Sequence, residues 1–372
     1  MKKLNLSGKD LRRIGLQEDK IMSIAKNVML KHYKHQSKGE ALEILKQVIN
    51  NPDKFLKHPE LGKIAQHLTR EESQQPQFPE LEEQKPYSIY GKEHIEPGAL
   101  QQMETAMRLP ITVKGSLMPD AHQGYGLPIG GVLATRNAII PYGVGMDIGC
   151  RMAMTAYSIH PDTIGKDISR WKDLLLQNTR FGRDEFKEKK EHPVIDRKEF
   201  KDIKFLKSLQ KKAYDQLGTS GHGNHFVDIG ILDVKVFIPE LNLEPGTYFA
   251  VLSHSGSRGT GAEIARHYTR IAKEKCSLPK GARELAWLEL DKEEGVEYWK
   301  AMNLAGDYSK ANHELIHKKI SRALNEEPLA RIENHHNFAW KEKFDGGEEL
   351  IVHRKGATPA EKGVLGIIPG SM

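Results

Sequence analysis

The chain has 372 residues, which is enough to bury a substantial core and more than most single domains need. Its 56 Lys and Arg residues against 50 Asp and Glu give a net charge of +6 without a polybasic tail, which suits a polyanionic substrate. Two cysteines exclude a disulfide framework, and the sequence shows neither a secretory hydrophobic segment nor a run of about 18 apolar residues, which favours a soluble protein of the reducing cytoplasm.

The first part of the chain predicts a helical appendage. Apolar residues recur at helical spacing in residues 18–35 and again in residues 41–49, so two amphipathic helices are expected. Residues 71–86 are rich in Gln, Glu and Pro, which is typical of a connecting loop at the surface. We therefore predict an N-terminal helical unit with its connector over residues 1–86.

Residues 118–153 are rich in glycine, and chemically active side chains stand between the glycines. Residues 129–133 and 139–140 predict short buried strands, in whose company a lone cysteine such as Cys150 is usually a core residue. Asp147 argues against that interpretation, because a carboxylate beside an apolar strand end is costly unless a positive group meets it. A bound metal is the simplest candidate for that positive group.

Residues 162–217 carry both charge signs and apolar residues spaced for helices. They form either a solvated helical cover or an RNA-facing surface in which basic side chains meet phosphates. Charge alone leaves both interpretations open. The basic residues concerned are Arg180, Arg183, Lys211 and Lys212.

Two glycine-rich turns follow, each next to a histidine at a strand end. His225 stands at the start of a predicted strand in which Phe226 and Asp228, two residues apart, share one face. His254 ends a second strand and opens a turn of hydroxyls, glycines and Arg258, a residue suited to phosphate contacts. Either histidine alone is more often structural, but the repetition of this arrangement favours a functional site.

The remaining sequence predicts helices over residues 262–275 and 294–323, followed by strands. His335 and His336 form a pair after the second helix, and Arg354 and Lys355 follow near the end of the chain.

Several blocks, in this order, closely resemble the RtcB family of GTP-dependent RNA ligases: MPDAHQGYGLPIGG, GVGMDIGC, GTSGHGNHF, HSGSRG, AMNLAGDYSKAN, HHN, RKGAT and IIPGSM. The resemblance implies an α/β fold of the α+β-like kind, with mixed sheets around a central metal cleft and helices at the periphery, over residues 87–372. It also implies an activity: joining RNA 3′-phosphate or 2′,3′-cyclic phosphate ends to 5′-hydroxyl ends in tRNA splicing or RNA repair, in some family members with the protein archease as partner.

The resemblance also implies the site. It identifies ligands of two Mn²⁺ ions, with the Cys150 thiolate as the bridge: Asp147, Cys150, His225, His254 and His336. Asp120 and Asn224 are expected to serve catalysis. A third set is expected to bind GTP: Asn224, Phe226, Asp228, Arg354, Lys355 and Ser371.

Two departures from the family pattern stand out. Asp228 occupies a position where the family commonly has Glu, and the family's Ser-His-Gly-Ala-Gly-Arg motif, whose histidine accepts GMP, does not occur in this sequence. We therefore expect a C-terminally incomplete chain, in which His353 does not replace that nucleophile. The alternatives to an RNA ligase are a non-catalytic RNA- or metal-binding fragment and a metal-dependent cyclic phosphodiesterase.

Overall fold

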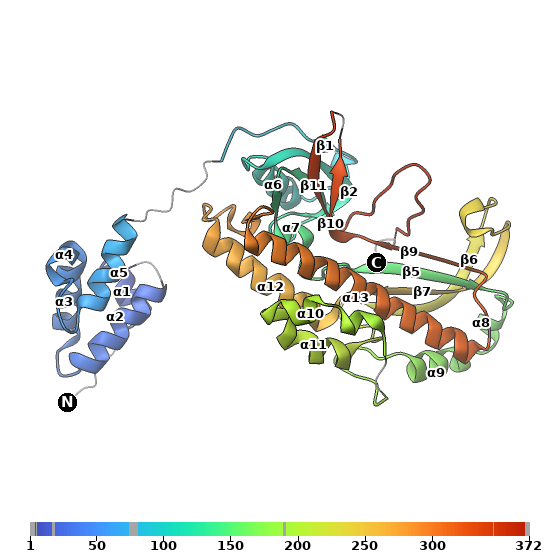
Figure 1. The fold of residues 1–372 in the computed structure, drawn as a ribbon, viewed down its shortest axis with the longest axis horizontal. Coiled ribbons are helices and arrows are strands. Elements are labelled where there is room, and N and C mark those ends of the chain that lie inside the picture. The colour runs from blue at the N-terminus through green and yellow to red at the C-terminus, as the bar shows by residue number, and fades with distance from the viewer. Residues whose placement is uncertain are drawn as a thin grey trace. The chain divides into compact units, whose positions relative to one another are not determined.

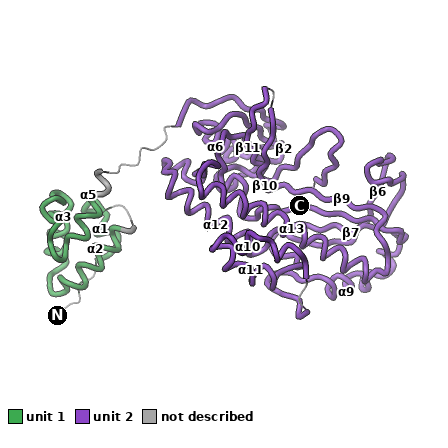
Figure 2. The backbone as a smooth tube through the Cα atoms, viewed as in Figure 1, with its two compact units in different colours: residues 1–77 green, residues 78–372 purple. Residues whose placement is uncertain are grey.

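The computed structural model describes residue 4 and residues 6–16, 19–73, 81–188, 191–344 and 346–368. The chain divides into two compact units, residues 1–77 and residues 78–372, here called the N-terminal and C-terminal units (Figure 2). The sequence analysis drew this boundary after residue 86.

The N-terminal unit is helical and has its own hydrophobic core. Its longer helices are amphipathic, and their apolar faces meet around Met29, Leu45 and Ile64, all fully buried. Ser37 begins one helix with a capping box, in which Glu40 N–H donates to Ser37 Oγ and Ser37 N–H donates to Glu40 Oε2 at 2.7 Å. The helices are α1 (Gly8–Arg13), α2 (Asp19–His32), α3 (Lys38–Asn50), α4 (Pro52–Phe55) and α5 (Gly62–Ser73).

The C-terminal unit contains a first sheet that joins segments far apart in sequence (Figure 1). The glycine-rich stretch supplies the central strand β3 and the end of β2, and β11 pairs antiparallel with β3 so that Val352 lies opposite Ala134. Helix α6 (Pro97–Ala106) packs against β2 and β3. The strand order is β1 (Ser88–Ile89), β2 (Thr112–His122), β3 (Ile129–Thr135), β11 (Glu349–Lys355) and β10 (Asn337–Lys343).

A second, antiparallel sheet carries the histidines that the sequence singled out. Its register places His254 between Phe226 and Met152, and Met152 opposite Asn334. Only His336 separates β9 from β10, so the two sheets are linked at that residue. The strand order is β6 (Phe226–Val234), β7 (Gly246–Ser255), β5 (Arg151–Tyr157) and β9 (Ala330–His335).

Helices cover one face of the second sheet. The long helix α13 (Glu293–Leu324) runs along the sheet in Figure 1, with α12 (Arg258–Lys275) beside it. This arrangement confirms the predicted α/β fold with mixed sheets and peripheral helices. The remaining elements are α7 (Pro141–Val144), α8 (Thr163–Lys166), α9 (Ile168–Asn178), α10 (Glu199–Asp202), α11 (Lys204–Gln216) and a small ladder of β4 (Ala138–Ile139) with β8 (Leu288–Glu289).

The segment over residues 162–217 is largely helical, as expected, and several of its cations already have partners. Lys211 pairs with Asp215 and Lys212 with Glu263, while the Arg180 guanidinium lies over the Phe186 ring. These contacts favour the helical cover over an RNA-facing surface. None of the helices that the structure describes is long and apolar enough to cross a membrane.

Candidate metal centre

The five side chains predicted as metal ligands lie together at one end of the second sheet. Asp147 and Cys150 occupy the turn between α7 and β5, and His254 lies near the end of β7. His225 directly precedes β6, and His336 lies between β9 and β10. Four separate segments of the chain therefore converge on one place.

Cys150 stands between two sets of donor atoms. Its Sγ lies 3.5 Å from His225 Nε2 and 3.1 Å from His254 Nε2. His225 Nε2 in turn lies 2.6 Å from Asp147 Oδ2, and His254 Nε2 lies 3.2 Å from His336 Nε2. The ligand atoms within each set lie within 4.8 Å of one another. The first set is Asp147, Cys150 and His225, and the second is Cys150, His254 and His336. Two ion sites that share one sulfur fit this arrangement.

Backbone contacts fix the turn that carries Asp147 and Cys150. Cys150 N–H donates to the Asp147 carbonyl at 3.2 Å, and His336 N–H donates to the Cys150 carbonyl at 3.1 Å. Gly149 adopts a φ of +71°, and a Cβ there would lie 2.7 Å from Gly306 Cα on α13. Only glycine fits this position, because the chain must turn while its backbone touches the helix.

The orientation of His254 is set by a hydrogen bond on its far side. Its Nδ1 lies 2.7 Å from the Asn224 carbonyl oxygen, which can only accept, so Nδ1 carries the proton in the neutral ring. The lone pair of Nε2 then faces His336 Nε2 and Cys150 Sγ. Metal-binding histidines are typically held by such a bond from the second nitrogen, so the ring is oriented for a cation.

The electrostatics of the cluster also favour a bound cation. Burial raises the pKa of the Cys150 thiol well above its usual range, and the neighbouring Asp147 carboxylate adds to this effect. Burial lowers the pKa of His336 to about 4, so its ring is neutral near pH 7. His225 Nδ1 is buried without a hydrogen-bond partner among the described residues. Neutral imidazoles and a thiol that needs positive charge to ionise are the donor set of a metal site.

The residues expected to bind GTP beside the cluster lie along the start of β6. Phe226 lies beside the cluster, with its ring centroid 5.6 Å from that of His254. Asp228 is exposed on the same face of the sheet, as the spacing predicted, and partial desolvation of its carboxyl raises its pKa. The Asn224 side chain is exposed next to His225.

Asp120 and Arg354 are not brought to the cluster, whereas Arg258 lies beside it, since a Cβ at Gly221 would lie 2.2 Å from Arg258 Nη1 and 2.5 Å from His225 Nδ1. The Asp120 side chain is exposed on β2, and none of its described contacts is with the five clustered residues. Arg354 forms an ion pair with Glu342 and stacks over Trp340. Arg258 donates to Thr219 Oγ1 at 3.0 Å and to the Gly182 carbonyl at 2.7 Å. Ser371 lies outside the described residues.

Lys355 has a structural role that the sequence did not reveal. Its ammonium is mostly buried and donates to the carbonyls of Tyr125, Leu127 and Tyr142 at 2.6, 2.9 and 3.2 Å. All three donors of the ammonium are thus used to tie β11 to the glycine-rich loop, and burial lowers its pKa to about 8. The expected role in GTP binding stays a prediction.

Lys355→Met is expected to destabilise the protein by roughly 2–4 kcal/mol, because three buried carbonyls lose their donor. Thermal unfolding followed by circular dichroism measures the effect, with Lys343→Met on the exposed side of β10 as the control. If Lys355 serves GTP instead, the variant will unfold like the wild type and lose nucleotide affinity.

Ser257 contacts the candidate site, which the sequence analysis did not predict. Its N–H donates to Asp147 Oδ1 at 3.1 Å, and its hydroxyl lies 3.5 Å from the same oxygen. The preceding Gly256 allows this approach, since a Cβ there would lie 2.1 Å from Asp147 Oδ1. The signal was present as the Ser-Gly-Ser step after His254, but nothing in the sequence showed that Asp147 lies against it.

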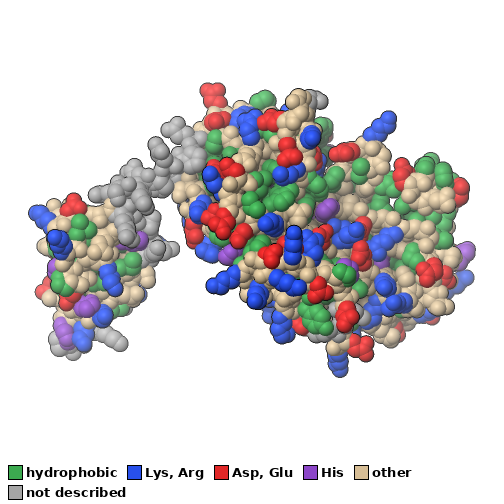
Figure 3. Space-filling view, viewed as in Figure 1, with side chains coloured by type: hydrophobic (Ala, Val, Ile, Leu, Met, Phe, Trp, Pro, Cys, Tyr) green, Lys and Arg blue, Asp and Glu red, His purple; other side chains and the backbone are tan. Residues whose placement is uncertain are grey.

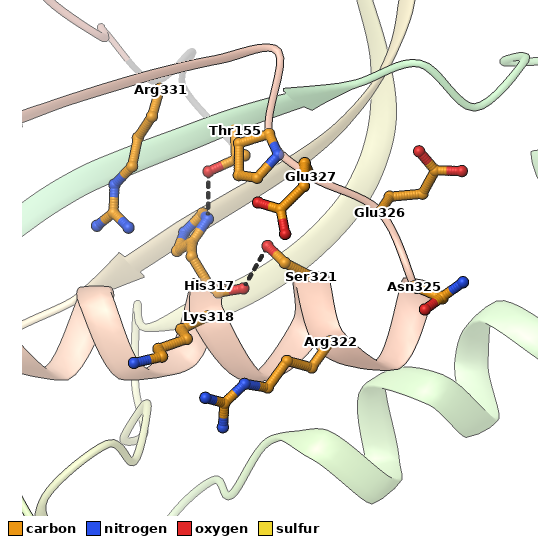
Figure 4. Close-up of a pocket in the computed structure, with 10 residues that line it drawn as sticks. Thr155, His317, Lys318, Ser321, Arg322, Asn325, Glu326, Glu327 and Arg331 are labelled. Carbon is orange, nitrogen blue, oxygen red and sulfur yellow. Dashed lines mark hydrogen bonds between the residues drawn. The ribbon is translucent and has the colours of Figure 1, made fainter.

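A cavity of about 700 Å³ lies elsewhere in the C-terminal unit, between the end of α13 and the second sheet. Figure 4 shows His317 at its base in a hydrogen bond with Thr155, and Ser253 Oγ lies 2.7 Å from the other ring nitrogen of His317. Because neighbouring residues of a strand point to opposite faces, Ser253 faces α13 while His254 faces the cluster. This cavity is therefore separate from the candidate metal centre.

His353 is a buried structural residue, in keeping with the expectation that it is not the nucleophile. Its Nε2 accepts from Ile140 N–H at 2.9 Å and its Nδ1 donates to the Leu133 carbonyl at 3.1 Å, so both nitrogens are occupied in the neutral ring. Burial lowers the pKa of His353 to about 4 and that of His317 to about 3.

Because the pKa values of His353 and His317 are lowered in the folded protein, we expect the fold to lose stability in acid. The unfolded chain binds protons at histidine below about pH 6.5, while the folded chain resists them until about pH 4, so stability is lost as pH falls through this window. Between pH 7 and pH 4 each ring accounts for a loss of roughly 3 kcal/mol. Melting temperatures measured from pH 7 to pH 4 should fall less steeply for His353→Gln than for the wild type. His94→Gln, at an exposed position, is the control, and equal pH dependence in all three proteins would refute the assignment.

Comparison with known proteins identifies the family. The model of the family described as "tRNA-splicing ligase RtcB" matches residues 102–204 and 196–372. The chain is 30% identical over 310 residues to the RNA-splicing ligase RtcB of Escherichia coli K12, covering 75% of this chain and 72% of that protein. It is 30% identical over 338 residues to the tRNA-splicing ligase RtcB of Thermococcus kodakarensis, covering 73% and 70%. For the tRNA-splicing ligase RtcB of Nanoarchaeum equitans the identity is 30% over 358 residues, covering 77% and 74%. The family model spans every segment of the clustered site, and on these matches the chain belongs to the RtcB family.

Proposed function

We propose that the protein is an RNA ligase that joins 3′-phosphate or 2′,3′-cyclic phosphate ends to 5′-hydroxyl ends with GTP and two Mn²⁺ ions. Its relatives are named RNA- or tRNA-splicing ligases, which supports the RNA substrate. The observation that carries the proposal is the convergence of five ligand side chains from four segments on the Cys150 sulfur.

In this proposal Asp147, Cys150 and His225 hold one ion, and Cys150, His254 and His336 hold the other. Carboxylate and imidazole suit Mn²⁺, and bound cations would offset the burial that raises the pKa of the Cys150 thiol and so favour its thiolate, which could serve both sets of ligands. The bound ions would polarise the RNA phosphate and favour ionisation of the attacking hydroxyl.

The nucleotide is proposed to lie along the start of β6. The Phe226 ring, partly exposed beside His254, offers a flat apolar surface to a base. Asp228 lies two residues further on the same face, where a carboxylate can accept hydrogen bonds from the N–H groups of guanine. The exposed Asn224 amide can donate to a phosphate oxygen.

The joining step can be tested on its own with an RNA whose 3′-phosphate already carries GMP. The 5′-hydroxyl oxygen of a second RNA attacks the 3′ phosphorus, the bond to GMP breaks, GMP leaves and the hydroxyl proton passes to solvent. We expect the purified protein with Mn²⁺ to join these RNAs, and His336→Ala to abolish joining. Release of GMP without a joined product would contradict the ligase and favour a metal-dependent hydrolase.

Two further expectations belong to this proposal. Both cysteines are free, which fits the reducing cytoplasm. An activating protein such as archease remains a prediction, and stimulation of joining by added archease would test it.

A further inference from the structure

The excess positive charge of the protein resides in its N-terminal unit. Residues 1–77 hold 15 of the 56 Lys and Arg residues but 9 of the 50 Asp and Glu, which gives them the whole net charge of +6. Residues 78–372 hold 41 of each sign. In Figure 3 blue side chains lie beside red and purple ones on the visible face of the N-terminal unit, and red and blue intermix on that of the C-terminal unit.

We propose that the N-terminal unit binds the phosphate backbone of the RNA substrate and so supplies the electrostatic attraction that the C-terminal unit lacks. The proposal rests on the proposed function, because it takes RNA as the substrate.

The basic surface is formed by two segments, residues 26–35 and 54–63. Together they contain a single acidic residue, Glu60. The end of α2 meets the turn before α5, where His32 Nδ1 lies 3.5 Å from Glu60 Oε1. Tyr33 also hydrogen-bonds to Glu60, and burial together with this contact raises the pKa of Tyr33 to about 12. The six lysines of these segments, here called the basic end, are Lys26, Lys31, Lys34, Lys54, Lys57 and Lys63.

All six lysines of the basic end are exposed, and none has an ion-pair partner among the described residues. Of the nearby carboxylates, Glu60 is engaged by His32 and Tyr33, and Asp53 precedes Lys54 in α4. Lys31 and His32 lie in the last turn of α2, where positive side chains stabilise the helix dipole. This effect accounts for the basic residues of that one turn and not for the other lysines of the basic end. Among the described residues, the basic end therefore carries an excess of positive charge that can meet phosphates.

In the C-terminal unit, three cations that the sequence suggested for phosphate or nucleotide contacts already have partners within the protein. Arg354 is paired with Glu342, Lys355 donates to three carbonyls and Arg258 donates to Thr219 and Gly182. Affinity for a polyanion depends on cations that neutralise phosphates and release counterions. The basic end is better placed to provide this contribution than these three buried or paired groups.

The surface of the N-terminal unit favours RNA over a protein or a membrane. Exposed large apolar side chains occur from Tyr90 onward, and the described residues of the N-terminal unit contribute none. Protein interfaces usually need buried aromatic or aliphatic anchors, and membrane-surface helices insert apolar side chains between lipids. A lysine-rich surface without such anchors fits a phosphate backbone, which is bound through charge alone.

The test uses the full chain with Lys31→Glu, Lys34→Glu and Lys57→Glu combined. Fluorescence anisotropy with a short single-stranded RNA gives the dissociation constant between about 50 mM and 200 mM salt. Loss of three phosphate contacts should lower the slope of log affinity against log salt by about 2 and weaken binding at low salt by roughly tenfold or more. The variant with glutamine at the same three positions should also bind RNA more weakly, with a smaller loss of affinity. Circular dichroism checks that each variant is folded.

The control carries the same charge change on exposed lysines of the C-terminal unit, Lys172→Glu, Lys201→Glu and Lys207→Glu. Its salt slope should stay close to that of the wild type. Equal weakening by both triple variants would show a general effect of net charge and overturn the proposal. The proposal would also be overturned if the triple variant of the basic end kept the wild-type salt slope for RNA but no longer bound vesicles of anionic phosphatidylglycerol, because the basic end would then serve a membrane surface.

The outcome is separable from that of the proposed function. If the wild-type protein joins guanylylated RNA and charge reversal at the basic end leaves the salt slope unchanged, only this inference is overturned. A protein that fails to join RNA but loses RNA affinity on that reversal overturns the ligase and leaves the RNA-binding unit in place.

Discussion

Replacing Cys150 with serine is expected to remove both manganese ions, because the one sulfur belongs to both sets of ligands. Its Sγ lies 3.5 Å from His225 Nε2 and 3.1 Å from His254 Nε2, and Cys150 is the one residue that the two described sets have in common. A serine hydroxyl is a far weaker ligand than a thiolate, and loss even of a group that supports a ligand costs 10–100-fold in affinity. We therefore expect Mn²⁺ to bind at least about 100-fold more weakly.

Elemental analysis after dialysis against Mn²⁺ measures this effect. The control is Cys276→Ser, which changes the only other cysteine, a buried residue at the end of α12. The control should keep its metal, while the Cys150 variant should lose both the metal and RNA joining. Undiminished manganese in the Cys150 variant would mean that the thiol is a core residue and not a ligand.

The second large effect is expected from Gly256→Ala, a change of one methyl group. The new Cβ would lie 2.1 Å from Asp147 Oδ1, so the carboxylate must move away from His225 and lose the Ser257 N–H. The set formed by Cys150, His254 and His336 does not include Asp147. Manganese content should therefore fall from two ions to one, and RNA joining should be lost.

Gly165→Ala is the matched control, because a Cβ at Gly165 in α8 meets no atom within 4 Å. This variant should retain two ions and full activity. If Gly256→Ala also retains both ions, the Asp147 side chain does not hold metal in the position that the structure gives it.

The fold was predictable from sequence where local periodicity carries the information. The amphipathic patterns of residues 18–35 and 294–323 correspond to α2 and α13, and the alternation after His225 corresponds to β6. Helices α1, α4 and α5 were missed. A pattern of four to six residues is too short to show a period in α1 and α4, whereas α5 (Gly62–Ser73) is long enough and was overlooked, and its last residues lie in the predicted loop of residues 71–86. Strand order was not predictable, because the pairing of β3 with β11 depends on residues more than 200 positions apart.

The candidate site shows the same division. Asp147 and Cys150 drew attention through their own neighbours, whereas His336 was assigned only through the resemblance to a family, because its partners are distant in sequence. The roles of Arg354 and Lys355 could not be read from the sequence. Arg354 pairs with Glu342 on the neighbouring strand, and Lys355 donates to carbonyls of a loop more than 200 residues away. The sequence alone does not show these partners.

The most direct test is a crystal structure of the manganese-soaked protein with anomalous diffraction data at the manganese absorption edge. We expect two anomalous peaks that share the Cys150 sulfur, one bonded to Asp147 and His225 and the other to His254 and His336. Peaks at any other place, or five ordered ligand side chains without a peak between them, would contradict a two-metal centre in this protein.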